Sequence, residues 1–225
     1  MPGYLITIEG IDGAGKTTQA ALLGRYLTHA GYAVLATHEP GGTPLGDKLR
    51  EIVLGQGLGP TTAAAELFLY LAARAEHVAR VIRPALERGL VVLCDRFSDS
   101  TLVYQGCGRG LDFGLLTAAD ALATGGLRPD LTIILDLPVE EAQRRLAASG
   151  RAADRLEAEG AEFLQRLRLG YLALAREDKE RRVLVEATGP AAAVFARVRN
   201  IVETFLREKA GLGDALTGPF RPRDC

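Results

Sequence analysis

Eight consecutive residues near the N-terminus have the types and the spacing needed to hold a chain of phosphates. They are Gly10, Ile11, Asp12, Gly13, Ala14, Gly15, Lys16 and Thr17, and they match the pattern G-x-x-x-x-G-K-[ST]. Glycines let such a backbone loop approach a phosphate closely, and the start of the following helix supplies positive partial charge. Lys16 adds a full charge for the outer phosphates, and the Thr17 hydroxyl is of the type that ligates Mg²⁺. We expect this loop, with Thr18 behind it, to bind a nucleoside triphosphate.

Three arginines in separate segments could hold a second anion. Arg50, Arg74 and Arg96 each present a planar fork that matches a phosphate dianion. Tyr70 lies four residues before Arg74, so both lie on one helix face, an arrangement suited to a flat base with a polar edge. A single arginine is more often a solvated surface charge, and Tyr70 suits core packing equally well.

Five short apolar runs are the elements that must position these residues. Because they are apolar throughout, they indicate strands buried on both faces of a parallel sheet. Alternation with helical patterns predicts an α/β fold, a doubly wound five-stranded parallel sheet flanked by helices. The predicted strands are Tyr4–Ile8, Ala33–Thr37, Val91–Cys94, Leu131–Leu135 and Val183–Glu186. Ligands in such sheets bind beyond the carboxyl ends of the strands, which is where the phosphate loop, Glu39 and the Asp95-Arg96 pair fall.

The helical patterns complete one domain over residues 1–210. One long helix is expected from Thr61 to Arg83, capped by Thr61 or Thr62 and kinked at Pro84. Further helices are expected at Thr18–Tyr26, Asp99–Gln105, Phe163–Arg176 and Ala191–Glu208. Residues 211–225 are expected to form a poorly ordered tail.

Composition excludes several classes of protein. A net charge of -1 argues against a general nucleic-acid binder, and no apolar run is long enough for a membrane span. The three cysteines lack paired spacing, which fits a reducing, cytoplasmic setting. The three histidines are scattered, which argues against a zinc site.

Phosphate loops serve GTPases, ATPases and small-molecule kinases alike. The only asparagine is Asn200, so the Asn-Lys-x-Asp element that reads guanine in GTPases is absent from the sequence. Scattered arginines favour a kinase of a small anionic acceptor. A kinase for another nucleotide, such as dUMP or a purine monophosphate, and an ATP-dependent regulatory protein both stay open.

Four further segments bring the chain to a known family. They are Glu39-Pro40-Gly41-Gly42-Thr43, Ala72-Ala73-Arg74, Asp95-Arg96-Phe97-Ser98-Asp99-Ser100-Thr101 with Tyr104-Gln105-Gly106, and Asp154-Arg155-Leu156-Glu157. Together with the phosphate loop they strongly resemble the bacterial thymidylate kinases, from Tyr4 to about Leu206. The resemblance implies a cytoplasmic homodimer that transfers the γ-phosphoryl of ATP to dTMP in dTTP synthesis, with Mg²⁺.

The resemblance also implies roles for individual residues. Arg50 and Arg96 would hold the 5′-phosphate of dTMP, Asp12 would face its 3′-hydroxyl, and Tyr70 would stack on thymine. Arg74 would reach thymine O4, and Tyr104 would leave little space for a 2′-hydroxyl. Ser100, Thr101 and Gln105 would line the same pocket. Thr17 and Asp95 would bind Mg²⁺ or order its waters, and Glu39 would lie near the transferring phosphate.

The chain departs from the family pattern at the positions of His38, where arginine is usual, and Tyr70, where phenylalanine is usual. Ala14 stands where some members carry an arginine, so the charge that stabilises transfer must come from elsewhere. We expect it from a mobile lid over about residues 144–157, with Arg151 as an internal arginine finger and Arg155 supporting it at ATP. A cis peptide bond before Pro40 is also expected.

Overall fold

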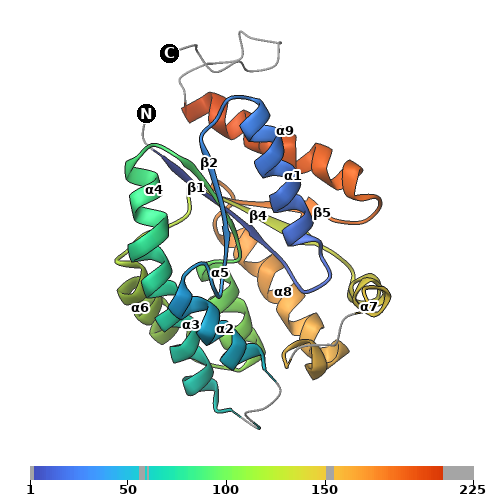
Figure 1. Cartoon of the computed structure of the whole chain (residues 1–225). Coiled ribbons are helices and arrows are strands. Elements are labelled where there is room, and N and C mark those ends of the chain that lie inside the picture. The colour runs from blue at the N-terminus through green and yellow to red at the C-terminus, as the bar shows by residue number, and fades with distance from the viewer. Residues whose placement is uncertain (1–2, 56–58, 60, 151–154, 210–225) are drawn as a thin grey trace.

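The structure is a computed structural model that describes residues 3–55, 59, 61–150 and 155–209. Five parallel strands form one sheet in the order β2-β3-β1-β4-β5 (Figure 1). The strands are β1 (Tyr4–Glu9), β2 (Val34–His38), β3 (Val91–Asp95), β4 (Leu131–Asp136) and β5 (Arg182–Glu186). The predicted fold class is therefore confirmed, because each apolar run became a strand within a residue or two of its predicted bounds.

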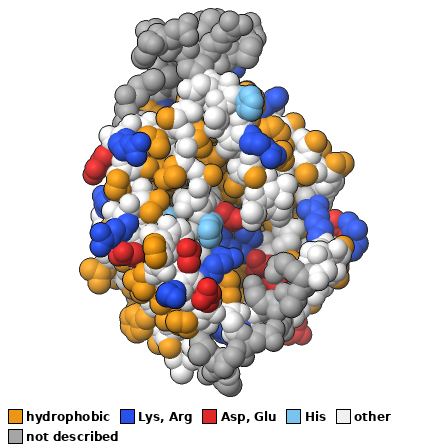
Figure 2. Space-filling model, in the orientation of Figure 1, with side chains coloured by type: hydrophobic (Ala, Val, Ile, Leu, Met, Phe, Trp, Pro, Cys, Tyr) orange, Lys and Arg blue, Asp and Glu red, His pale blue; other side chains and the backbone are white. Residues whose placement is uncertain are grey.

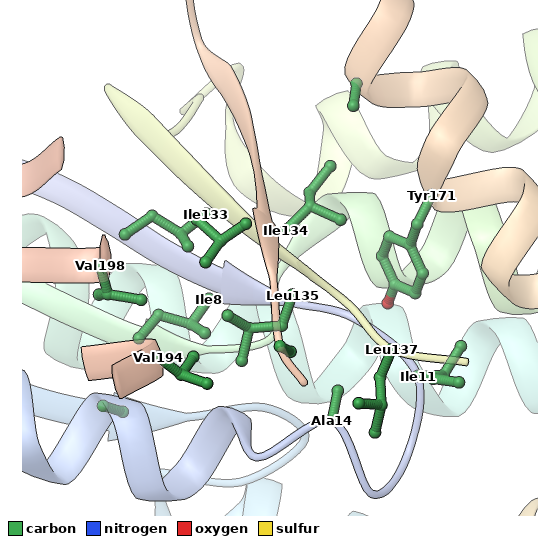
Figure 3. Close-up of a cluster of buried hydrophobic side chains, with 14 of the residues drawn as sticks. Ile8, Ile11, Ala14, Ile133, Ile134, Leu135, Leu137, Tyr171, Val194 and Val198 are labelled. Atoms are coloured by element: carbon green, nitrogen blue, oxygen red, sulfur yellow. The ribbon is translucent and has the colours of Figure 1, made fainter. Parts of the chain in front are cut away.

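Alternate side chains of the strands face two different layers of helices. Ile6, Ile8 and Leu93 belong to the large core cluster that includes apolar residues of α1 (Lys16–His29) and α9 (Ala191–Lys209). Figure 3 shows Ile8 and Leu135 beside Val194 and Val198 of α9, with Tyr171 of α8 (Ala161–Glu177) at the far side of the strands. Burial on both faces explains why the strand sequences are almost continuously apolar.

A second cluster packs against the other face of the sheet. Leu5, Val92 and Cys94 contact apolar residues that come from η2 (Val78–Ile82), a π-helical turn, and from α4 (Arg83–Glu87). These two elements continue α3 (Ala63–His77), whose N-cap Thr62 accepts a hydrogen bond from the amide of Ala65. The predicted long helix is thus present, with a wider turn before Pro84, because proline offers no amide hydrogen and its ring crowds the preceding turn.

Several helices were not predicted. They are α2 (Pro44–Leu54), α6 (Phe113–Thr124), α7 (Val139–Ala148) and the short 3₁₀ element η4 (Glu157–Glu159). The helix expected over Asp99–Gln105 is instead α5 (Ser98–Thr101) followed by the π-helical η3 (Leu102–Gly108). The Thr43 and Asp112 side chains cap α2 and α6 by accepting from the amides of Gly46 and Leu115, both at 2.9 Å. Threonine and aspartate are preferred N-cap residues, so the starts of these two helices were predictable from the sequence.

No helix within the described residues is long and apolar enough to cross a membrane. Residues 211–225, expected to form a tail, lie outside the described residues, as do residues 151–154 of the expected lid.

Candidate active site

The phosphate loop connects β1 to α1 through a tight backbone path. Gly13 has a φ of +82°, and a Cβ there would lie 2.6 Å from the carbonyl oxygen of Ala142, so the site requires glycine. The Lys16 ammonium is buried and donates to the Ile11 carbonyl at 2.9 Å, which bends the lysine back over the loop. Burial and the nearby Arg96 guanidinium lower the pKa of Lys16. Asp12 Oδ1 lies 3.7 Å from the Lys16 ammonium, and a phosphate bound in the loop would add further negative charge beside it.

Asp12 and Arg96 meet where the ends of β1 and β3 lie side by side. The Arg96 guanidinium donates through Nη2 to Asp12 Oδ1 and, at 3.0 Å, to the Tyr104 hydroxyl, which donates to Asp12 Oδ2 at 2.7 Å. Although burial opposes ionisation, the Arg96 charge holds the pKa of Asp12 well below its usual range. Among the described residues, Arg96 alone combines a non-glycine side chain with a positive φ, +71°. Such backbone strain is a common feature of functional sites.

The buried carboxylate of Glu9, which was not predicted as a site residue, is linked to Arg96 through the Ser100 hydroxyl. Glu9, at the end of β1, accepts hydrogen bonds from the Ser100 hydroxyl at 2.6 Å and from the Tyr171 hydroxyl at 2.9 Å. The Ser100 hydroxyl in turn accepts from Arg96 Nη1 at 3.2 Å. Burial, with a smaller contribution from Asp99, raises the pKa of Glu9 to about 7.

A cavity opens beside this arginine, between α2, α3 and η3. The structure brings together all nine residues expected to bind the acceptor, and they line this cavity: Asp12, Arg50, Tyr70, Arg74, Arg96, Ser100, Thr101, Tyr104 and Gln105. Glu39, Pro40, Leu54 and Leu156 complete the lining. An apolar wall with a few convergent cations suits a flat base that carries a phosphate.

Arg74 is fixed on several sides within this cavity wall. Its Nε donates to Glu39 Oε2 at 2.7 Å, and its Nη1 donates to the Thr101 hydroxyl and to Asp120 Oδ1. Its Cζ atom lies over the Phe97 ring, 5.2 Å from the ring centroid. Glu39, which was expected near the transferring phosphate, is thus engaged by Arg74, although it lines both this cavity and the neighbouring cleft. The expected cis bond before Pro40 is confirmed.

Thr17 and Asp95 offer oxygen atoms at the edge of the phosphate loop. The Thr17 hydroxyl donates to Asp95 Oδ2 at 2.5 Å, while Asp95 Oδ1 is buried without a hydrogen-bond partner among the described residues. A hydroxyl and a carboxylate oxygen are hard ligands of the kind that Mg²⁺ prefers. The unsatisfied oxygen therefore fits the expected metal site.

A larger cleft runs along the phosphate loop. Its lining includes Lys16, Thr17, His38, Asp95 and Arg145. An adjoining hollow lies between the loop and the start of α9 and is lined in part by Thr18, Gln19, Gly189 and Ala191. The cleft shares Asp12, Glu39, Arg50 and Arg96 with the smaller cavity. Figure 2 shows cationic and acidic side chains gathered near the middle of this face of the molecule.

Comparisons with known proteins place this geometry in a family. A family model described as Thymidylate kinase matches residues 8–198. The chain belongs to the thymidylate kinase family. It is 52% identical over 205 residues to a thymidylate kinase of Thermomicrobium roseum, covering 89% of this chain and 96% of that protein. It is 49% identical over 210 residues to one from Desulfovibrio desulfuricans, covering 91% of this chain and 97% of the relative. A crystal structure of thymidylate kinase from Ehrlichia chaffeensis superimposes with a TM-score of 0.74 at 31% identity, covering 90% of this chain and all of that one.

The lid expected over about residues 144–157 is only partly described, because residues 151–154 lie outside the described part of the chain. Arg151, the expected finger, lies outside the described residues. Arg155 is described, and its guanidinium is engaged by α2 and α3. Its Nε donates to the Val53 carbonyl at 3.0 Å, and its Nη2 donates to Glu66. The buried carboxylate of Glu66 attracts this cation more strongly than open solvent beside the phosphate loop does.

Glu66 is a second residue that the sequence analysis missed. It is buried on α3 and accepts from Gln105 at 2.9 Å and from Arg109 at 3.2 Å, in addition to Arg155. These donors hold its pKa below the usual value although burial opposes this. Glu66 thus connects Arg155 to Gln105 in the wall of the smaller cavity.

Proposed function

We propose that this chain transfers the γ-phosphoryl group of ATP to dTMP, giving ADP and dTDP for dTTP synthesis. The observation that carries the proposal is the pair of cavities that share Asp12 and Arg96. One cavity has the lining expected for a nucleotide base with its phosphate, and the other follows the phosphate loop. Two nucleotides bound in them would meet end to end, with their phosphates at Lys16 and Arg96. In-line positioning and charge neutralisation are the main requirements of phosphoryl transfer.

The acceptor residues would contact different parts of dTMP. Arg96 and Arg50 would hold the 5′-phosphate of dTMP, and Asp12 would accept from its 3′-hydroxyl. The Tyr70 ring would stack on thymine, and Arg74 would donate to thymine O4. Tyr104 would crowd the 2′ position and so favour deoxyribose. Ser100, Thr101 and Gln105 would complete the wall.

The donor side uses the phosphate loop, from Gly10 to Thr18, to hold ATP. Lys16 would neutralise the outer phosphates, and Thr17 with Asp95 would hold Mg²⁺. The ion supplies positive charge at the phosphate oxygens when bound. The acceptor is already an anionic phosphate, so no side chain is required as a general base. Arg151 in a mobile lid over about residues 144–157 would add charge to the transferring group.

The activity test is a coupled assay of ADP release with a panel of acceptors. We expect release that depends on dTMP, with kcat/KM for dTMP more than about tenfold above that for dUMP or any purine monophosphate, because an unmade hydrogen bond or a lost methyl contact costs at least this much. Preference for another monophosphate would assign a different kinase. ATP binding without any acceptor-dependent ADP release would instead favour a regulatory protein.

We also infer that the chain forms a homodimer through α2, α3 and α6. The exposed large apolar side chains include Leu45 and Ile52 of α2, Phe68 of α3, and Leu115 and Leu122 of α6. Figure 2 shows apolar side chains gathered over α3 and α6 at the lower left. Exposed apolar surface of this kind marks an interaction site, and a second copy of the chain is the occupant we propose. A cytoplasmic location is proposed on the free thiols of Cys94 and Cys107.

A further inference from the structure

A buried chain of polar side chains runs from Arg74 through Glu39, in the cavity wall, to His77 and β2. His77, one turn after Arg74 on α3, has no exposed surface, and Glu39 and Arg74 are 4% and 2% exposed. His77 Nδ1 lies 3.0 Å from Glu39 Oε1, and Glu39 Oε2 accepts from Arg74 Nε at 2.7 Å. His77 Nε2 lies 2.7 Å from the hydroxyl of Thr37 on β2. A continuous path of hydrogen bonds thus runs from the sheet to the cavity wall.

The chemistry of the partners fixes the direction of the bond between His77 and Glu39. The Glu39 carboxylate only accepts, because its pKa is held low by Arg74 and His77 although burial opposes this. His77 Nδ1 must therefore carry a hydrogen and donate. The Thr37 hydroxyl can donate or accept and pairs with Nε2, so both ring nitrogens of His77 are hydrogen-bonded.

The imidazole of His77 packs against Gly42, the second glycine of the Glu-Pro-Gly-Gly turn, where a side chain would collide with it. A Cβ on Gly42 would lie 2.7 Å from His77 Nε2, and Gly42 has a φ of +77°. The turn therefore closes directly over the histidine ring, and the second glycine of the motif is required by that close approach. The turn and His77 together determine where the Glu39 carboxylate points.

The contacts of Arg74 with Glu39 and its neighbours leave one of its nitrogens for the acceptor. Nε and Nη1 are used by Glu39, Thr101 and Asp120. Nη2 has no hydrogen-bond partner in the part of the chain that the structure describes, and Arg74 lines the cavity with Tyr70 and Gln105. A guanidinium nitrogen can only donate, so it can donate to a carbonyl oxygen at the base edge but cannot pair with an amino group, which is also a donor.

We propose that His77 is a positioning residue that sets base selectivity: it holds Glu39, and Glu39 aims Arg74 at a carbonyl oxygen of the acceptor base. The inference rests on the proposed contact of Arg74 with the base. A pyrimidine with a keto group at position 4 is then selected over one with an amino group there. If the Arg74 guanidinium is less well held, this discrimination falls, because a misaligned donor binds a 4-keto base less tightly and excludes a 4-amino base less strongly.

The test compares two substitutions of the histidine. His77→Leu keeps apolar bulk and removes the donor, whereas His77→Asn keeps an N–H group at the position of Nδ1. Calorimetry gives the dissociation constants for dTMP and dCMP, and steady-state kinetics give KM for ATP. We expect His77→Leu to weaken dTMP binding and to lower the dCMP-to-dTMP ratio of dissociation constants by roughly tenfold or more. KM for ATP should stay within about twofold of the unaltered chain, and His77→Asn should restore most of the ratio.

Two further variants keep the inference open to refutation. His29→Leu is the matched control, because His29 is exposed on α1 and bonds within its own helix, to the Arg25 carbonyl; it should change nothing. Thr37→Val leaves the imidazole in place and removes its other partner, so it serves if His77→Leu fails to fold; a roughly threefold loss of the ratio is expected.

Each contrary outcome has a different meaning. If Arg74→Gln loses the selectivity while Thr37→Val and both His77 variants keep it within twofold, His77 has no positioning role. If Arg74→Gln also keeps it, Arg74 does not read the base, and the inference fails with that assignment. Failure of the unaltered chain to phosphorylate dTMP would instead overturn the proposed function.

Discussion

Replacement of Glu9 by glutamine should change how the stability of the protein depends on pH. The carboxyl is fully buried, and its pKa is raised from 4.5 to about 7. Between these values the native carboxyl keeps a proton that the unfolded chain has lost. The free energy of unfolding therefore falls as pH rises through this range; the contribution is fully present below about 4.5 and lost above about 7.

The magnitude follows from the two pKa values. Linkage between pH 5 and pH 8 gives a loss of about 2.5 kcal/mol from this one group. Glutamine resembles the protonated acid: its oxygen can accept from the amides of Phe97 and Ser100, and its amino group can donate to the hydroxyls of Ser100 and Tyr171. The variant should therefore keep the geometry without the pH dependence.

The assay is equilibrium unfolding in urea for both proteins at half-unit steps from pH 5 to pH 8. The unfolding free energy of Glu9→Gln minus that of the unaltered chain should rise by about 2.5 kcal/mol over this range. Ser100→Ala removes a donor to the ionised Glu9 carboxylate and so raises its pKa further. In this variant the fall of the unfolding free energy with pH should therefore continue to higher pH. A difference between Glu9→Gln and the unaltered chain that stays constant within about 0.5 kcal/mol would refute the reasoning, because it would mean that Glu9 titrates alike in both states.

Three other substitutions probe the proposed roles. Arg151→Ala should lower kcat by roughly 10³-fold or more at saturating substrates, whereas Arg25→Ala, at an exposed position of α1, should not; near-normal turnover of Arg151→Ala would remove it from the chemistry. Asp95→Asn should lower kcat and raise the Mg²⁺ concentration needed for half-maximal rate while dTMP binding without ATP stays within about threefold, because Asp95 lies outside the acceptor cavity; an unchanged Mg²⁺ dependence would count against the metal site. Phe68→Asp, at a side chain that is 66% exposed, should give monomers in sedimentation velocity, whereas Leu169→Asp, at one 55% exposed on α8, should not; dimers in both would place the interface elsewhere.

Local chemistry explains what could be predicted from the sequence. The strands were found because they are short and largely apolar, as burial on both faces requires of the inner strands β1, β3 and β4. The phosphate loop was found because its glycines, its lysine and its threonine all lie within eight consecutive residues. Arg74 and Tyr70 could be paired because four residues bring them to one side of a helix. In each case the signal lies within a few residues.

The supporting residues were missed because their partners are distant in the sequence. Glu9 follows an apolar strand and resembles an ordinary strand end, yet Tyr171, its hydrogen-bond donor, lies 162 residues away. Glu66 binds Arg155 across 89 residues. His77 is one of three scattered histidines, and only the packing of α3 against β2 brings it to Thr37. No local pattern encodes such contacts, because the fold itself creates them.

The meeting of two nucleotides at Arg96 can be observed in a crystal structure with dTMP and a non-hydrolysable ATP analogue. We expect the thymine ring against Tyr70 with its carbonyl toward Arg74, the acceptor phosphate between Arg50 and Arg96, and the terminal phosphate of the analogue at Lys16. An analogue in the phosphate loop with dTMP bound elsewhere, or with its phosphate turned away from Arg96, would contradict the proposed mechanism.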